Sequence, residues 1–294
     1  MTIYYTMTRR TYRKSSPSRT RHRKRTARAT AIVIIVGVLL VSAMYSAIKQ
    51  QNADATGDKR LPYPYDGLYR VEMPAGNPQE IVDYPGFTVN FNAELHIPNY
   101  VVWELTAAEC DGTEKRLGNF FKDENVAGCA DLQDYKKSGY TRGHMAPAAD
   151  MKWSAEAMRA SNNLTNICPQ AAAMNSGAWS TLEDNCRSWA RRDSALVIIT
   201  GPVLTDRMPL HIGRNHVAVP ERFFKVVFAP FANPPRGIGF IMPNRRVQGG
   251  VQNHAVSIDQ VEEVTGYDFF SILPDELETE IESQCSYPKW QTLK

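Results

Sequence analysis

The residues best suited to chemistry lie in a short segment, residues 140–150, whose centre reads Arg142-Gly143-His144. A histidine has an unperturbed pKa near neutrality, so His144 can accept a proton from water at working pH. Gly143 lets the backbone approach closely, and the Arg142 guanidinium is a fixed cation for anionic oxygens. Alone, an Arg-Gly-His turn is more often an ordinary surface turn than a catalytic site.

A second group of polar residues follows downstream. Asn166 opens an Asn-Ile-Cys-Pro-Gln segment, Asn175 follows nine residues later, and Glu183 and Arg187 are four residues apart. A helix over residues 176–191, at about 100° per residue, places Glu183 and Arg187 on the edge of an apolar stripe. That stripe consists of Trp179, Leu182, Cys186, Trp189 and Ala190. The bland interpretation is a surface i, i+4 pair and an Asn175 helix cap; the functional one is a polar edge facing a phosphate.

These linked segments resemble the DNA/RNA non-specific endonucleases, the sugar-non-specific, endonuclease G-like nucleases of the ββα-metal type. The hallmark of that family reads Asp-Arg-Gly-His, then Ser/Thr-Asn-x-x-Pro-Gln, then Asn-x-x-x-Trp-x-x-Leu-Glu. The chain carries the three motifs in this order, and the resemblance covers roughly residues 60 to 285. One position differs, because Thr141 stands where the hallmark has Asp.

The resemblance implies a metal-dependent phosphodiester hydrolase. Such a reaction needs an activated water, neutralised phosphate oxygens and a stabilised leaving oxygen. The family pattern makes His144 the general base and Asn175 the protein ligand of Mg²⁺ (or Mn²⁺), which accepts oxygen ligands and keeps several waters. By the same pattern Glu183 holds metal-bound waters, and Arg142 and Arg187 bind phosphate and stabilise charge.

Supporting residues follow from the same resemblance. Arg116 falls where related nucleases carry a further phosphate-contacting arginine, and Asn166 is expected to pin the loop beside the site. Thr141 in place of Asp removes a carboxylate that would orient its neighbours, so we expect a retained fold with reduced or lost activity. The rival hypothesis is therefore a catalytically weak or silent nucleic-acid-binding or uptake protein; a phosphodiesterase for small substrates is a third.

Other metal and cofactor classes find little support in the sequence. It contains no Cys-x-x-Cys pair, no His-Glu-x-x-His motif and no phosphate-cradling glycine loop, which argues against zinc and nucleotide cofactors. The remaining histidines have no acidic or cysteine partner at ligand spacing and are interpreted as ordinary residues. They are His22, His96, His211, His216 and His254.

The N-terminal part of the chain predicts a membrane anchor. Residues 1–29 carry ten Lys/Arg and no acid, and residues 31–48 are eighteen residues without a charge. That run approaches the roughly 20 residues of a membrane-spanning helix, and the one-sided basic charge places the arm in the cytoplasm. Alternatives are a nucleic-acid-binding tail, a signal peptide cleaved near residues 41–43, which would make the protein secreted, and a buried core helix.

The predicted organisation is a basic arm (1–29), a transmembrane helix (30–48), a linker (49–60) and one nuclease domain (61–294). Without the arm the chain has 24 basic and 31 acidic residues, a net charge of −7. The domain would lie outside the cytoplasm and act on DNA and RNA through the phosphate backbone, and a homodimer is possible. A negative domain needs a local basic strip to attract a polyanion.

The domain itself predicts an α+β fold, a mostly antiparallel sheet with packed helices. Runs rich in β-branched and aromatic residues predict strands, and hairpin-length connections favour antiparallel pairing. The predicted strands are 88–91, 100–105, 195–200, 223–228 and 237–242; the predicted helices are 154–160, 176–191 and 257–265.

The five cysteines all follow the apolar run, in the compartment where disulfides persist. An odd number leaves at least one free or intermolecular thiol. We predict a Cys110–Cys129 bridge and a free Cys168, with a Cys186–Cys285 pair as an unsupported option.

Overall fold

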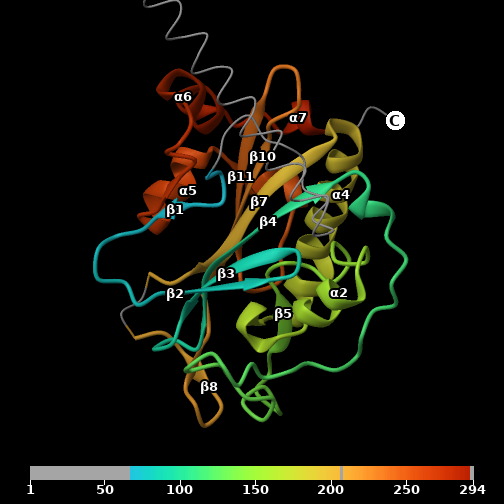
Figure 1. The fold of residues 1–294 in the computed structure, drawn as a ribbon. Helices are drawn as coiled ribbons and strands as arrows, with labels where there is room; N and C mark the ends of the chain where they lie inside the picture. Colours follow the sequence, from blue (N-terminus) through green and yellow to red (C-terminus); the bar gives the residue numbers. More distant parts are fainter. Residues whose placement is uncertain (1–66, 206–207, 292–294) are drawn as a thin grey trace, which may run out of the picture. The chain divides into compact units, whose positions relative to one another are not determined.

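The computed structural model describes residues 67–205 and 208–291, coloured along the chain in Figure 1. The described residues all belong to one compact unit, Tyr63–Lys294. The predicted arm (1–29), transmembrane helix (30–48) and linker (49–60) lie outside the described residues. Within the described part, no helix combines the length and apolar character needed to cross a bilayer.

A seven-stranded antiparallel sheet forms the centre of the fold (Figure 1). All neighbouring strands in it pair antiparallel, which confirms the predicted α+β class and the five predicted strands. From one edge to the other it contains β12 (Ala255–Val256), β11 (Arg236–Pro243), β10 (Arg222–Ala229), β7 (Ala195–Val203), β4 (Ile97–Thr106), β3 (Phe87–Asn92) and β2 (Glu80–Tyr84).

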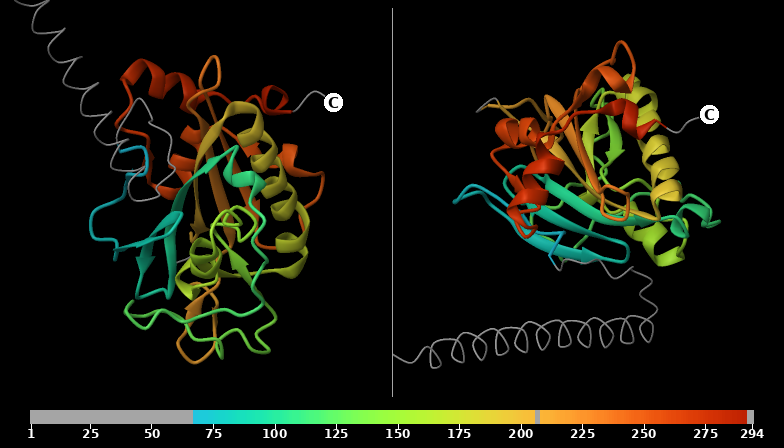
Figure 2. Two further views of the ribbon diagram at one scale, coloured as in Figure 1. Left: turned by 45° about the vertical axis from the view of Figure 1, so that its right-hand side comes forward. Right: turned by 90° about the horizontal axis from the view of Figure 1, so that it is seen from above.

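The central strands are buried on both faces, which explains their nearly continuous apolar sequences. Side chains alternate between the two faces of a strand, and in β10 Phe223 and Val227 enter one core while Phe224 and Val226 enter the other. We call these cores the α4-side core and the α5-side core after the helices α4 (Ser180–Asp193) and α5 (Ile258–Thr265) that cover them. The right-hand view of Figure 2 shows the sheet between α4 and the pair α5 and α6 (Asp275–Ser283).

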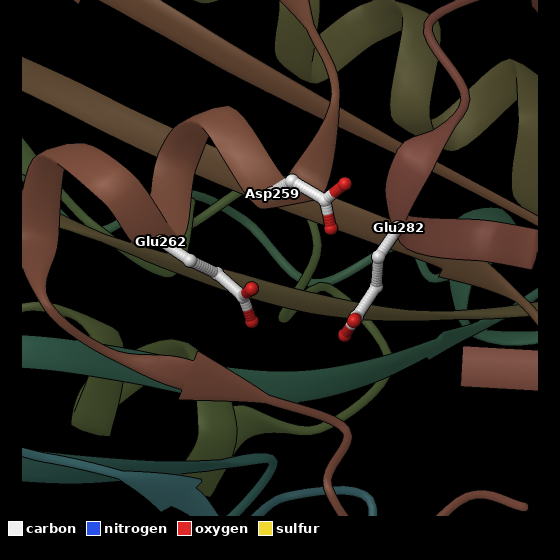
Figure 3. Close-up of side chains that lie close together, drawn as sticks. All are labelled: Asp259, Glu262 and Glu282. Atoms are coloured by element: carbon white, nitrogen blue, oxygen red, sulfur yellow. The ribbon is translucent and has the colours of Figure 1, made fainter. Parts of the chain in front are cut away.

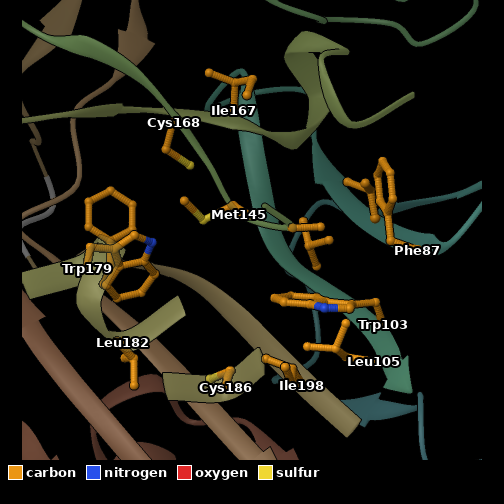
Figure 4. Close-up of a cluster of buried hydrophobic side chains, with 14 of the residues drawn as sticks. Phe87, Trp103, Leu105, Met145, Ile167, Cys168, Trp179, Leu182, Cys186 and Ile198 are labelled. Carbon is orange, nitrogen blue, oxygen red and sulfur yellow. The ribbon is translucent and has the colours of Figure 1, made fainter. Parts of the chain in front are cut away.

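The α4-side core also receives α2 (Ala155–Ser161) and the two-stranded pair β5 (Thr141–His144) and β6 (Ile167–Gln170). Figure 4 shows part of this core, in which Ile167 and Cys168 of β6 lie on the same side as Trp103 of the central sheet. The apolar stripe predicted for the helix after Asn175 is confirmed, because all five of its residues are at most 2% exposed. The buried stripe therefore sets the orientation of the edge of α4 that carries Glu183 and Arg187.

The start of this helix differs from the prediction. The helix was expected from Ser176, but α4 begins at Ser180 and follows α3 (Ala172–Met174) and a wide π turn, Asn175–Trp179. Gly177 within that turn has non-helical backbone angles, so Asn175 is not the N-cap of α4. Because glycine has no side chain, Gly177 can adopt these angles, whereas a residue with a side chain would favour helical ones.

The predicted Cys110–Cys129 bridge is wrong, because both thiols are free and buried. Cys110 lies just beyond the end of β4, whereas Cys129 follows Gly128, whose carbonyl lies 2.7 Å from His96 Nδ1 at the start of that strand. Ten residues at about 3.3 Å per residue separate the two ends of β4 by about 30 Å, and a disulfide needs Cα atoms within about 7 Å. The predicted free thiol of Cys168 is confirmed.

The remaining short elements complete the periphery. Helices α6 and α7 and the short strands were not predicted, since two- to four-residue strands carry little periodicity. The short strands are β1 (Val71–Glu72) paired with β13 (Asp268–Phe269) and β8 (His211–Ile212) paired with β9 (Val217–Ala218). The periphery also contains α7 (Tyr287–Trp290) and the 3₁₀ turns Glu109–Asp111, Leu164–Asn166 and Val251–His254.

Candidate active site

The strand pair β5–β6 carries the central motif of the sequence. Gly143 pairs with Cys168, and His144 pairs with Ile167. A Cβ atom on Gly143 would lie 2.0 Å from Oε1 of Gln170. A side chain at this position would therefore have to displace the buried Gln170 side chain, which favours glycine between Arg142 and His144.

His144 is held by a side chain that the sequence analysis did not select. Its Nε2 lies 2.8 Å from Oδ1 of Asn162. The Nδ2 of Asn162 donates to the carbonyls of Leu117 (3.2 Å) and Asn119 (2.9 Å). Because both amide protons are used on carbonyls, the Asn162 oxygen faces the imidazole and accepts from Nε2–H. In neutral His144 the lone pair is then on Nδ1.

The surroundings keep His144 neutral. Burial lowers the pKa of His144 to about 4, and the positive charges of Arg116 and Arg142 act in the same direction, against the opposing effect of the Asn162 hydrogen bond. Only 7% of the residue is exposed, and at pH 7 the buried imidazole is therefore unprotonated. A neutral imidazole with a free Nδ1 has the protonation state of a general base.

Arginines and aromatic rings surround this histidine. The Phe120 ring lies 5.2 Å from the His144 ring, and the Arg142 guanidinium stacks 4.4 Å above Phe120. Arg116 and Arg142 are both exposed, so their charges face solvent. Beside them is a hollow of about 460 Å³ lined by Phe120, Leu132, Tyr135, Lys136, Tyr140, Thr141 and Arg142.

Thr141 connects the strand pair to the turn before α4. Its hydroxyl donates to the carbonyl of Gln170 (2.9 Å) and accepts from Nδ2 of Asn175 (3.0 Å). The two bonds orient the half-buried Asn175 amide so that its carbonyl oxygen remains available to another partner. The threonine hydroxyl thus orients this amide without a negative charge.

Asn166 fastens the chain that follows His144. Its Oδ1 accepts from the backbone N–H of Ala146 (2.9 Å), and its Nδ2 donates to the carbonyls of Ala146 (2.9 Å) and Ser161 (2.8 Å). All three side-chain bonds go to backbone groups. Asn166 therefore has a structural role beside the site and does not face the reacting groups.

Arg187 on α4 is tied to two aspartates. Its Nη1 donates to Oδ1 of Asp150 at 2.6 Å and its Nη2 donates to Asp184. The other carboxylate oxygen of Asp150 accepts from the indole N–H of Trp103 at 3.2 Å. Arg187 pairs with these aspartates and not with Glu183, so the i, i+4 ion pair of the bland interpretation is absent from the described contacts.

Glu183 and Lys225 form the inner edge of this charged group. Burial raises the pKa of Glu183 to about 7, while Lys225, and to a smaller extent Arg187, oppose that rise. Lys225 in β10 is 1% exposed, and its Nζ has no hydrogen-bond partner among the described residues. The ammonium lies 4.9 Å from the Trp103 ring and 4.8 Å from the Trp179 ring, two indoles that enter the same core (Figure 4).

The structure thus arranges the selected residues in three groups. One comprises His144 with Arg116 and Arg142, and another joins Thr141 to Asn175. The third comprises Glu183 and Arg187 with two residues that sequence reasoning missed, Asp150 and Lys225.

Two of the three missed residues have recognisable sequence signals. Lys225 interrupts the apolar run Phe-Phe-Lys-Val-Val-Phe, and a charge inside a buried strand needs a reason. Asp150 closes the segment that contains His144. Asn162 has no comparable signal, since its role depends on carbonyls more than 40 residues away.

The sequence matches a known protein family and several named relatives. Residues 65–276 match the family described as DNA/RNA non-specific endonuclease. The protein named Nuclease 1, mitochondrial, of Schizosaccharomyces pombe is 31% identical over 210 residues, covering 64% of this chain and 65% of that protein. The chain therefore matches slightly less than two thirds of that protein's length.

Two further comparisons agree with this match. A protein named Nuclease from Nostoc sp. is 32% identical over 212 residues, covering 67% of this chain and 76% of that protein. A crystal structure of an EndoG/EndoGI complex, titled for the mechanism of EndoG inhibition, superposes with a TM-score of 0.64 at 25% identity. It covers 70% of this chain and 91% of that chain.

Proposed function

Because this chain belongs to the DNA/RNA non-specific endonuclease family, we propose that it hydrolyses phosphodiester bonds of DNA and RNA with the help of Mg²⁺ or Mn²⁺. Contacts to the phosphate backbone carry no sequence information, so cleavage has little sequence preference. The observation that carries the proposal is the anchored hydrogen bond from His144 to Asn162.

In this proposal His144 is the general base. The bond from Nε2–H to Asn162 fixes the ring and leaves Nδ1 to take a proton from the attacking water. Arg116 and Arg142 serve as phosphate-binding cations, because both are exposed and close enough to His144 to influence its pKa. Their charges also keep the imidazole neutral, and a general base must be unprotonated to act.

The donor set of the site fits a hard divalent cation. Asn175 gives its Nδ2 to Thr141, so its free oxygen is the proposed protein ligand. Glu183 adds a carboxylate on the same helical segment, in the role of holding metal-bound waters. Oxygen ligands and retained waters suit Mg²⁺. When bound, the cation would polarise a phosphate oxygen and stabilise charge on the leaving oxygen.

In this proposal Arg187 stabilises negative charge on the substrate phosphate. Its two ion pairs keep its guanidinium at a fixed place on α4, where a cation can stabilise charge that develops on phosphate. Preorganised charge of this kind costs no rearrangement during the reaction. Thr141 supports Asn175 in place of the hallmark Asp, which favours an active enzyme over a silent binding protein.

The proposal is tested by nicking of a supercoiled plasmid and cleavage of a single-stranded RNA. We expect both substrates to be cut in Mg²⁺ or Mn²⁺ and neither in excess chelator. In Asn175→Ala the rate should fall at low Mg²⁺ and recover partly as Mg²⁺ is raised. Binding of both nucleic acids without cleavage under any divalent cation would favour the silent binding protein.

We further propose that residues 30–48 anchor the chain in a membrane, with the basic arm in the cytoplasm and the nuclease domain outside it. The support is the uncharged run with basic residues on one side only. Protease added to intact cells or spheroplasts should degrade the domain. Complete protection that is lost on lysis would contradict this orientation.

A further inference from the structure

Three carboxylates converge on the side of the sheet opposite to the candidate active site. Asp259 and Glu262 belong to α5, and Glu282 belongs to α6. One carboxylate oxygen from each lies within 4.8 Å of the others. Figure 3 shows the three side chains directed toward a common space between the two helices.

Glu282 is the residue that requires an explanation. It is only 7% exposed, and its Oε1 is buried without a hydrogen-bond partner among the described residues. A buried carboxylate without a partner is strongly unfavourable unless a proton or a cation neutralises it. Ile281, the preceding residue, is buried in the α5-side core and holds this part of α6 against the sheet.

The segment that carries the three carboxylates has no basic side chain to neutralise Glu282. Residues 247–288 contain nine Asp or Glu residues and no Lys or Arg. None of the ion pairs among residues 67–205 and 208–291 involves the three carboxylates. Glu262 is oriented by the backbone N–H of Phe269, which donates to its Oε1 at 2.8 Å.

A proton could neutralise Glu282 alone. Burial, together with the charges of Glu262 and other acidic neighbours, raises the pKa of Glu282 to about 9. One proton still leaves two carboxylates, Asp259 and Glu262, facing each other at short distance. A cation satisfies an oxygen of all three side chains at once.

We propose that Asp259, Glu262 and Glu282 bind a hard divalent cation of the Ca²⁺ class that ties α5 to α6. Ca²⁺ accepts six to eight oxygen ligands in flexible geometry, whereas Mg²⁺ generally takes one or two carboxylates and keeps its waters. The exposed Asp259 opens the site to solvent, which supplies the remaining ligands. Both helices pack on the α5-side core, so this cation stabilises the fold and takes no part in chemistry on the α4 side.

The test compares thermal unfolding of the full chain at pH 7 after chelator treatment and in a Ca²⁺ titration. The experiment uses an Asn175→Ala background, so that the proposed catalytic ligand does not contribute. Free Ca²⁺ at about a hundred times its Kd should raise Tm by on the order of 5–10 °C. Glu282→Gln should abolish the rise, whereas Glu280→Gln, an exposed carboxylate on the same helix, should retain it.

A second variant keeps the test decisive if Glu282→Gln fails to fold. Asp259→Asn changes an exposed residue and should weaken the Ca²⁺ response at least tenfold in apparent affinity. A Tm that does not respond to Ca²⁺, with Glu282→Gln more stable than its parent at every Ca²⁺ concentration, would assign the site to a proton and overturn the proposal. An equal Ca²⁺ response in all variants would also overturn it. Neither result bears on the nuclease proposal.

Discussion

At the scale of single residues, the site depends on how amide side chains are oriented. Asn162 uses its two amide protons on carbonyls, so its oxygen faces His144. Asn175 gives its Nδ2 to Thr141, so its oxygen is free to bind. In both cases a second hydrogen bond decides which end of an ambiguous amide meets the functional partner. Such supporting bonds typically change metal affinity by 10- to 100-fold when removed.

The role of Thr141 is tested by removing only its hydroxyl. Thr141→Val keeps the shape but deprives Asn175 Nδ2 of its acceptor, so we expect the Mg²⁺ concentration for half-maximal nicking to rise about tenfold. Thr141→Ser keeps the hydroxyl and should behave like the parent. Valine and serine variants with the same Mg²⁺ dependence would show that the hydroxyl does not position Asn175.

The buried, neutral His144 also predicts a pH dependence of stability. Its folded-state pKa, about 4, is below the unfolded value of about 6.5. Between these values the unfolded chain binds more protons, so stability falls as pH falls from 6.5 toward 4. From pH 6.5 to 4.5 this group should cost about 2 kcal/mol.

The measurement is urea unfolding at pH 6.5 and pH 4.5 of the parent and of His144→Asn. The loss of unfolding free energy on acidification should be about 2 kcal/mol smaller in the variant, because the titrating imidazole is gone. Equal losses in both proteins would mean that His144 titrates normally and is accessible to water.

At the scale of elements, α4 is fixed to the segment after β5 by one buried ion pair. Arg187 is 14% exposed at its side chain and Asp150 is 1% exposed, whereas Asp184, its other partner, is 70% exposed. Asp150→Asn leaves a buried guanidinium without its main counter-charge, which typically costs about 3–5 kcal/mol. Asp184→Asn removes an exposed partner and should cost less than about 1 kcal/mol.

Thermal unfolding of the two variants separates these cases. For a domain of this size each kcal/mol shifts Tm by about 2–4 °C, so Asp150→Asn should unfold well below Asp184→Asn. Similar melting temperatures would mean that Arg187 gains no more from the buried partner than from the exposed one.

The same elements show what sequence patterns can and cannot predict. The central strands were predictable because both faces are buried and their apolar runs are long. β5 and β6 have four residues each and contain Gly143 and Pro169, so neither reads as a strand, although they carry the site. With the kink at Gly177, α4 begins four residues after the predicted start. The predicted Cys110–Cys129 bridge was wrong because sequence spacing does not show that β4 separates the two residues.

The site residues also divide into those that sequence motifs indicate and those that only the fold brings into place. His144, Asn175, Glu183 and Arg187 were selected from motif spacing within residues 65–276, which match the family, and their catalytic roles stay predictions. Their hydrogen-bond partners could not be selected in this way, since Asn162 contacts carbonyls that only folding brings near. Thr141 was expected to weaken the site, whereas the structure gives its hydroxyl a bond to Asn175.

At the scale of the whole molecule, charge is distributed unevenly. The chain beyond residue 29 has a net charge of −7, yet Arg116, Lys136 and Arg142 lie around the candidate site. A polyanion should therefore be held by a few local contacts. Three neutralised phosphates predict a slope of log Kobs against log salt of about −3.

This slope is measured by binding of a short duplex in Ca²⁺-free chelator buffer at several salt concentrations. Arg142→Gln should reduce the slope by about one unit, because one phosphate contact is lost. Arg70→Gln is a matched control, an exposed arginine beside Val71 of the α5-side core. An equal reduction in both variants would indicate diffuse attraction to the whole surface.

The measurement that tests the central claim most directly is single-turnover plasmid cleavage in Mg²⁺ by the parent and by His144→Ala. General-base catalysis typically contributes about 10²- to 10⁴-fold, so the variant should cleave at least 100-fold more slowly. Plasmid binding in chelator should be unchanged within about twofold, because Arg116 and Arg142 remain. A folded His144→Ala protein that nicks plasmid at the parental rate would contradict the assignment of His144 as the base.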